Sequence, residues 1–206
     1  DIEVVEEYPD RYSVAASRQH RWVRGDWQLL PWLTTHWFGM KEVLEAPIPA
    51  LGLWKMVDNL RRSVTPVALV FCFMIGWLFL PAEIAVRWTV AIALIGAFPT
   101  FLPSVLGSVP KRKGVTVDSQ VRANLDDFSH ALAYAIASLV FLGHQAWLMA
   151  DAVFRTIYRL KFSRKNMLEW TTAAQAASSP SPGIGILARM MFGSVVVGAI
   201  ALAIAI

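Results

Sequence analysis

The sequence predicts an all-α membrane protein, in which several transmembrane helices are joined to helices that lie on the cytoplasmic surface of the membrane. Of its 206 residues, 56% are hydrophobic and only 17% are charged, so the chain is more apolar than an ordinary soluble domain. Uncharged runs of membrane-spanning length separate the charged segments. Nine tryptophans agree with this class, because indole rings favour the membrane–water interface.

The first two spans are predicted to form a helical hairpin within residues 61–110. The run from Ser63 to Ala82 contains no charged residue and has the length that crosses a hydrocarbon core. The second span begins at Trp88, after the short connection EIAVR. Pro99 and Pro103 lie one turn apart in this span, and we expect them to kink the helix or to end it early.

Basic residues on both sides of the hairpin indicate its orientation. Arg61 and Arg62 precede the first span, and the basic run KRK at residues 111–113 follows the second. Basic flanks stay in the cytoplasm under the positive-inside rule. We therefore place both flanks inside and Glu83 to Arg87 outside.

Residues 111–182 are predicted to form a cytoplasmic loop and a long interfacial helix. The stretch Ala131 to Ala150 is apolar enough to span, but a spanning helix would leave one of two basic clusters outside. We therefore favour an interfacial helix over a transmembrane one. A continuous helix would carry a narrow polar stripe of Asp127, His130, Tyr134, Ser138, Gln145, Arg155 and Arg159.

The two ends of the chain complete the predicted organisation. Residues 1–60 are interpreted as short interfacial helices, broken at positions such as Gly25 and Pro31. Residues 183–206 are predicted to be a last transmembrane helix, which follows a linker rich in serine and proline. The chain opens without a methionine or a signal-peptide pattern and closes inside an apolar run, so we interpret it as part of a longer polypeptide.

Charge and cysteine content exclude several classes of function. The net charge of +4 is scattered between apolar runs, which argues against a nucleic-acid partner. The single cysteine, Cys72, cannot form a disulfide within the chain. No cysteine and histidine residues show zinc spacing, so no metal ligand is assigned.

The charged stretch RQHRWVRGDWQ, from Arg18 to Gln28, is the candidate functional segment. On a helix, Arg18, Arg21 and Arg24 fall within an arc of roughly 120° and repel one another unless an anion lies among them. Two interpretations remain open. The arginines bind a phosphorylated ligand, whose oxygens match the guanidinium fork, or they anchor the segment to anionic lipid headgroups.

Neighbouring side chains suit a sugar next to a phosphate. Trp22 offers a flat apolar face on which a sugar ring can stack. Asp26, one turn further on, could bind hydroxyl groups or orient an arginine. His20 could donate a hydrogen bond to phosphate, and a purely structural histidine is equally compatible with the sequence.

This segment resembles the Q-x-x-R-W region of processive membrane glycosyltransferases of the cellulose synthase type. The similarity runs through Arg21, Trp22, Arg24, Gly25 and Gln28, although Arg18 and Gln19 depart from the usual order. RQHRWVRGDWQLLPWL and the later block LEWTTAAQA are, more specifically, similar to cyclic β-1,2-glucan synthases.

The resemblance implies an inverting transfer of glucose from UDP-glucose to a growing glucan chain, at the cytoplasmic face of a bacterial inner membrane. Arg21 would then be catalytic, because it would stabilise the diphosphate leaving group, and Trp22 would support the acceptor glucose. Four further side chains would contact substrate or hold the loop that does so: Arg18, Gln19, Arg24 and Asp26. His20 is added to this set as a possible phosphate donor.

The resemblance also implies what lies outside this chain. A GT-A-type transferase domain would precede it and end within residues 1–60, and a phosphorylase-like domain of the same polypeptide would follow. The catalytic base and the ligands of a Mg²⁺ or Mn²⁺ ion would belong to the upstream domain. The alternatives are a non-catalytic module that anchors a protein to the bilayer, and a related synthase of another β-glucan.

A second short similarity falls in KRKGVTVD, from Lys111 to Asp118. Related synthases carry a gating loop with a Val–Thr pair at this place, comparable to Val115 and Thr116. A plain basic membrane flank explains the same residues, and we favour that interpretation.

Overall fold

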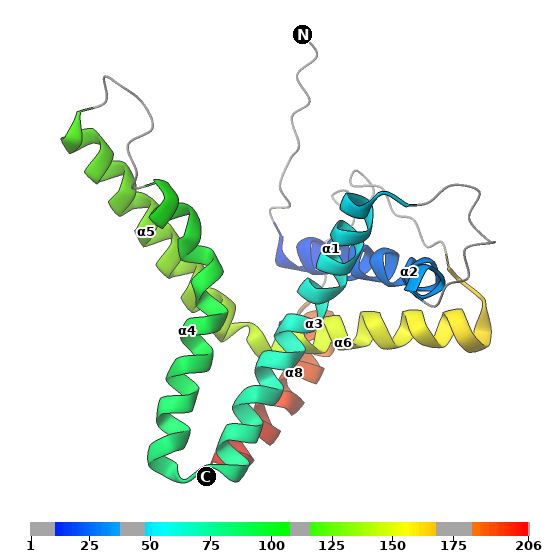
Figure 1. The fold of residues 1–206 in the computed structure, drawn as a ribbon. Coiled ribbons are helices and arrows are strands. Elements are labelled where there is room, and N and C mark those ends of the chain that lie inside the picture. The colour runs from blue at the N-terminus through cyan, green and yellow to red at the C-terminus, as the bar shows by residue number, and fades with distance from the viewer. Residues whose placement is uncertain (1–10, 38–47, 108–115, 168–182, 206) are drawn as a thin grey trace. The chain divides into compact units, whose positions relative to one another are not determined.

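The computed structural model describes residues 11–37, 48–107, 116–167 and 183–205, and this part of the chain is helical (Figure 1). The predicted all-α membrane fold is confirmed: the described residues form no strand, and three helices are long and apolar enough to cross a membrane. The elements are α1 Tyr12–Gln28, α2 Leu30–Trp37, α3 Ala50–Phe79, α4 Ala82–Gly107, α5 Val117–Val140, α6 Leu142–Tyr158, a π-helical turn Arg159–Ser163, and α8 Ile184–Ala205.

The three candidate spans are α3, α4 and α8. Their most apolar windows are only 11%, 11% and 6% buried within the protein, so nearly all of their apolar surface is left for lipid. A helix that is apolar all round is typical of a membrane span. A membrane location follows, while the cytoplasmic side of each flank stays a prediction.

The chain divides into two compact units. One contains Asp1–Val67 and His144–Val196, and the other contains Ala68–Gly143 and Val197–Ile206. The first unit holds α1, α2, the beginning of α3 and almost all of α6. The second holds the rest of α3 with α4 and α5.

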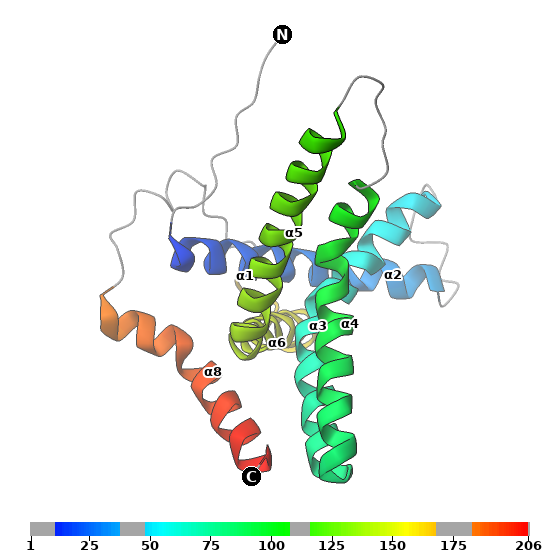
Figure 2. The same cartoon turned by 90° about the vertical axis from the view of Figure 1, so that its left-hand side faces the viewer.

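In the second unit, α3 and α4 form the predicted hairpin, and Figure 1 and Figure 2 show them meeting at their short connection. Trp77 Nε1 donates to Thr89 Oγ1 over 2.8 Å, and Trp88 Nε1 donates to the Cys72 carbonyl oxygen over 2.7 Å. A Cβ atom at Gly76 would overlap the Trp88 indole, so the absence of a side chain there permits the close approach. The indole N–H groups of both tryptophans thus have hydrogen-bond acceptors inside the apolar hairpin.

Of the two outcomes expected for the prolines of the second span, a kink or an early end, the early end is wrong. Pro99 and Pro103 both lie inside α4, which continues to Gly107. Each proline removes one hydrogen bond of the helix. In lipid, however, every further unsatisfied backbone group costs several kcal/mol, so the remaining helical bonds are kept. The expected break at Gly25 is also wrong, since α1 runs through it.

The prediction of one continuous helix around Ala131 to Ala150 is wrong as well. Phe141 interrupts it: α5 ends at Val140, and the Phe141 N–H donates to the Ala137 carbonyl oxygen as a cap. α5 packs against α4, whereas α6 packs against α1, so the two halves of the predicted helix are held by different neighbouring helices. The polar stripe is therefore divided between two helices. Together they would count as a fourth, broken span, and the interfacial placement stays a prediction.

Candidate functional site

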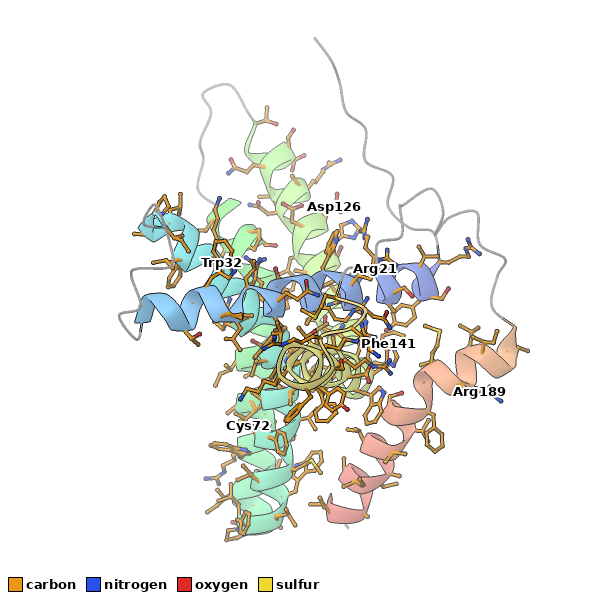
Figure 3. All side chains as sticks on the ribbon, turned by 90° about the vertical axis from the view of Figure 1, so that its right-hand side faces the viewer. Arg21, Trp32, Cys72, Asp126, Phe141 and Arg189 are labelled. Atoms are coloured by element: carbon orange, nitrogen blue, oxygen red, sulfur yellow. The ribbon has the colours of Figure 1, made fainter. Side chains whose placement is uncertain are left out.

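The motif residues Arg18 to Gln28 lie on α1, which is not one of the three candidate spans. Figure 3 shows Arg21 on this helix, with α6 seen end-on beside it. α1 buries Ala16 and Val23, and Val23 packs with Met149 and Ala152 of α6. Because its small apolar residues recur at helical spacing, α1 has one face fixed against α6 and two flanks left for other contacts.

Polar contacts at the end of the motif hold α1 in this position. Trp27 Nε1 donates to Ser63 Oγ of α3 over 2.8 Å, and Gln28 Nε2 donates to the Met167 carbonyl oxygen over 2.7 Å. Two residues of the motif region thus connect α1 to its neighbours. Gln28, which belongs to the similarity with processive synthases, has a structural role here.

One flank of α1 opens on what we call the cationic hollow, a cavity of about 520 Å³. Its charged lining combines Arg21 and Arg24 of α1 with Arg155 of α6. Among the described residues, no carboxylate pairs with Arg21, whereas Arg61, Arg62, Arg122 and Arg155 are each paired with an aspartate. An arginine without a carboxylate in a concave site is available to an anion from outside.

His20 also lines the cationic hollow, and its Nε2 lies 3.0 Å from Asp151 Oδ2. Burial lowers the pKa of His20, although the hydrogen bond and charge of Asp151 act in the opposite direction. The neutral ring is therefore favoured, and it donates its Nε2 proton to Asp151. His20 thus connects α1 to α6, and Nε2 is not the atom that would reach a phosphate.

The other flank of α1 opens on a second cavity of about 580 Å³, which we call the Trp22 hollow. Its polar lining comes from α1, α3 and α6, and consists of Arg18, Gln19, Trp22, Asp26, Asn59, Arg62, Ser63 and Gln145. One aromatic face surrounded by amide, carboxylate and guanidinium groups suits a molecule with many hydroxyl groups.

Trp22 is 60% exposed, so its ring is open to a ligand. The Arg18 guanidinium carbon lies 4.8 Å from the centre of that ring, in a cation–π contact. Arg18 therefore covers one face of the indole and leaves the other for stacking.

Asp26 faces the same hollow and accepts a hydrogen bond of 3.0 Å from Asn59 Nδ2. Burial raises the pKa of Asp26, while the Asn59 hydrogen bond and the Arg62 charge oppose that shift. Asp26 is thus held by α3 rather than by an arginine of its own helix.

The structure separates residues that the sequence grouped together. Arg21 and Arg24 line the cationic hollow, whereas Arg18 lines the Trp22 hollow. The reason is the packing of Val23 on Met149 and Ala152 of α6, which places Arg18 and Arg21 on either side of the opposite, exposed face of α1. The predicted cluster of three arginines is therefore two arginines on one flank and one on the other.

No protein-family model matches this chain. The curated cyclic β-(1,2)-glucan synthase NdvB of Rhizobium meliloti (strain 1021) is 40% identical to it over 205 residues. The chain is similar, over its whole length, to one segment of that synthase. The alignment covers 100% of this chain and 7% of the relative. The resemblance to cyclic β-1,2-glucan synthases, predicted from RQHRWVRGDWQLLPWL, is thus confirmed for the segment.

The structure brings to the site further side chains that the sequence did not indicate. Asn59 of α3 binds Asp26, and Asp151 of α6 binds both His20 and Arg155. Arg155 was noticed only as a member of the polar stripe. The spacing of Asp151 and Arg155, four residues apart on a helix, predicts their mutual pair but gives no sign of α1 as a neighbour.

The metal ion that the resemblance implies finds no set of ligands in the residues that the structure describes. No three histidine, cysteine, aspartate or glutamate side chains gather there. No step of the chemistry is therefore assigned to a metal held by these residues. Of the possible gating pair, Val115 lies outside the described residues, and Thr116 caps α5 by accepting a hydrogen bond from the Ser119 N–H.

Replacing Gly25 with alanine should stabilise α1. A Cβ atom at Gly25 would meet nothing within 4 Å, and glycine inside a helix costs roughly 0.8–1.0 kcal/mol relative to alanine. We expect the Gly25→Ala protein to gain up to about 1 kcal/mol in free energy of unfolding, measured by denaturation in detergent. A loss of stability would contradict the open surroundings of Gly25.

Proposed function

We propose that this chain is the membrane part of an enzyme that polymerises glucose from UDP-glucose into cyclic β-1,2-glucan by inverting transfer. The main observation behind this proposal is that the two flanks of α1 present different chemical groups. On one flank the helix presents an arginine that no carboxylate of the described residues pairs with, and on the other an exposed tryptophan in a polar cavity. The identity of 40% to a cyclic glucan synthase over the whole chain supports the same reaction.

In this proposal Arg21 acts on the leaving group. The acceptor hydroxyl attacks the anomeric carbon, and the bond from that carbon to the diphosphate breaks. Negative charge then grows on the departing diphosphate. A guanidinium placed beforehand in a cavity stabilises that charge more than it stabilises the intact nucleotide sugar.

Trp22 acts on the acceptor. A glucose ring has an apolar face of C–H groups, which stacks on the side of the indole that Arg18 leaves free. Gln19 and Asp26 in the same hollow offer hydrogen bonds to its hydroxyl groups. The catalytic base, the bound metal and the GT-A-type fold belong, in this proposal, to the upstream domain of the same polypeptide.

Substituting Trp22 in the whole synthase separates this function from a lipid anchor. Trp22→Ala should lower glucose incorporation from UDP-glucose by roughly 10-fold to 100-fold, since burying an aromatic side chain contributes about 1.5–3 kcal/mol. Trp32→Ala is the matched control, because Trp32 on α2 is 51% exposed and lines neither cavity. Incorporation would be measured with labelled UDP-glucose in membranes.

The anchor alternative predicts a different pattern. There, Trp22→Ala and Trp32→Ala weaken membrane association to the same extent and leave polymer synthesis unchanged in the protein that stays bound. That result would reject the site. Linkage analysis of the product distinguishes β-1,2-glucan from another β-glucan.

A further inference from the structure

Positively charged side chains gather in the cationic hollow. Three guanidinium groups, those of Arg21, Arg24 and Arg155, line it. Arg155 pairs with Asp151, whereas among the described residues no carboxylate pairs with Arg21. The charge of Arg21 therefore stays available to an anion, in a cavity large enough for a phosphate-containing ligand.

Asp151 fixes how Arg155 is presented. Arg155 Nε lies 2.8 Å from Asp151 Oδ1 and 2.7 Å from Oδ2, one helical turn away. Asp151 Oδ2 is also 3.0 Å from His20 Nε2 of α1. The same carboxylate thus binds an arginine on α6 and a histidine on α1. It therefore fixes the position of the two helices, and of these side chains, relative to each other.

The bond to Asp151 uses only one donor of Arg155. Within the described chain, Arg155 bonds to protein through Nε alone, so its two terminal NH₂ groups are left for another acceptor. A guanidinium held through Nε has a fixed plane, and its terminal NH₂ groups match two oxygens of a phosphate. Its side chain is 55% exposed, which leaves it accessible from the hollow.

We propose that Arg155, oriented by Asp151, is a second phosphate-binding arginine and completes with Arg21 a site for the diphosphate of a nucleotide. The proposal rests on the proposed function, because that function supplies the nucleoside diphosphate. Arg155 contacts the phosphate oxygens, and Asp151 is a positioning residue that acts through Arg155. The family motif on α1 is thereby only half of the anion site, and α6 provides the rest.

A lipid headgroup offers the same phosphate chemistry, so the test has to separate the two sources. The whole synthase would be placed in nanodiscs of phosphatidylcholine alone, and in nanodiscs that also contain phosphatidylglycerol. Direct binding of UDP, UMP and uridine would be measured without turnover. Arg155→Gln keeps the length and polarity of the side chain, so it is the variant to use.

In phosphatidylcholine, Arg155→Gln should weaken UDP binding by roughly 10-fold to 100-fold, as expected for a lost hydrogen-bonded charge. UMP should lose less affinity and uridine none, and the unchanged uridine affinity reports an intact fold. Asp151→Asn should weaken UDP binding in the same direction. The double variant should be hardly weaker than Arg155→Gln alone, because the amide oxygen of asparagine still accepts from His20 and the effect of the lost charge runs through Arg155.

Lys161→Gln is the matched control, since this exposed cation follows α6 and does not line the hollow. Unchanged UDP affinity in Arg155→Gln would overturn the inference, and so would an effect seen only with phosphatidylglycerol present, which indicates a lipid site. If Trp22→Ala loses polymer synthesis while Arg155→Gln binds UDP normally, the proposed function holds and the role of Arg155 is rejected. If UDP binding depends on Arg155 but the protein makes no glucan, the role of Arg155 holds and the proposed function is rejected.

Discussion

Replacing Arg21 with alanine in the whole synthase should reduce glucan synthesis from UDP-glucose by roughly 100-fold to 1,000-fold, the usual effect of removing one preorganised group that stabilises transition-state charge. The expectation follows from the position of Arg21 in the cationic hollow, where the described residues provide no carboxylate for it. Turnover should fall more than UDP-glucose affinity, because charge on the diphosphate grows as the bond breaks. Initial rates over a range of UDP-glucose concentrations would measure both.

Two variants make this test specific. Arg122→Ala removes an arginine of α5 that forms an exposed ion pair with Asp118. Exposed ion pairs contribute little to stability, so this variant should leave the rate nearly unchanged. Arg21→Lys keeps the charge but loses the planar fork, so it should recover only part of the activity. Activity of Arg21→Ala within a few-fold of the original protein would remove Arg21 from the reaction.

Replacing Gly76 with alanine should destabilise the α3–α4 hairpin by about 1–3 kcal/mol, the range for overpacking. The new Cβ atom would overlap the Trp88 indole. If the ring moves away, Trp88 Nε1 loses the Cys72 carbonyl oxygen, which is 2.7 Å from it. An unpaired indole N–H in lipid adds to the cost. The free energy of unfolding in detergent micelles would measure the loss.

Two further glycines of the spans give a graded control. A Cβ atom at Gly96 would lie 3.1 Å from a Leu69 methyl group, and one at Gly198 would meet nothing within 4 Å. Stability should therefore fall most for Gly76→Ala, less for Gly96→Ala and not at all for Gly198→Ala. Adding Trp88→Leu to Gly76→Ala should restore part of the loss. Equal effects at all three positions would show that backbone entropy, and not the Trp88 contact, decides the outcome.

Much of the fold could be predicted from the sequence because lipid imposes a simple rule. A chain in a hydrocarbon core has to satisfy its backbone within helices, so uncharged runs such as Ser63 to Ala82 indicate spans directly. The same rule explains why Pro99 and Pro103 do not end α4 early. Proline preferences learned in water predict a helix end, but in lipid the helix continues to Gly107.

Neither the break at Phe141 nor the arrangement of the site could be predicted in the same way. A helical periodicity carries on through any position whose residue tolerates a helix, and Phe141 does. What ends the helix is the different packing of α5 on α4 and of α6 on α1. These are contacts between residues far apart in the chain, which local pattern does not contain.

By itself, the sequence determined that this protein is helical, apolar enough to enter a membrane and equipped with the arginine–tryptophan motif on a helix. Those properties depend on composition and on neighbours within a few residues. Only the tertiary structure decided that Arg18 and Arg21 serve different cavities and that Asp151 and Arg155 join the motif. The physical reason is that burying Val23 against Met149 and Ala152 of α6 orients α1, and this orientation assigns each of its charged side chains to one flank or the other.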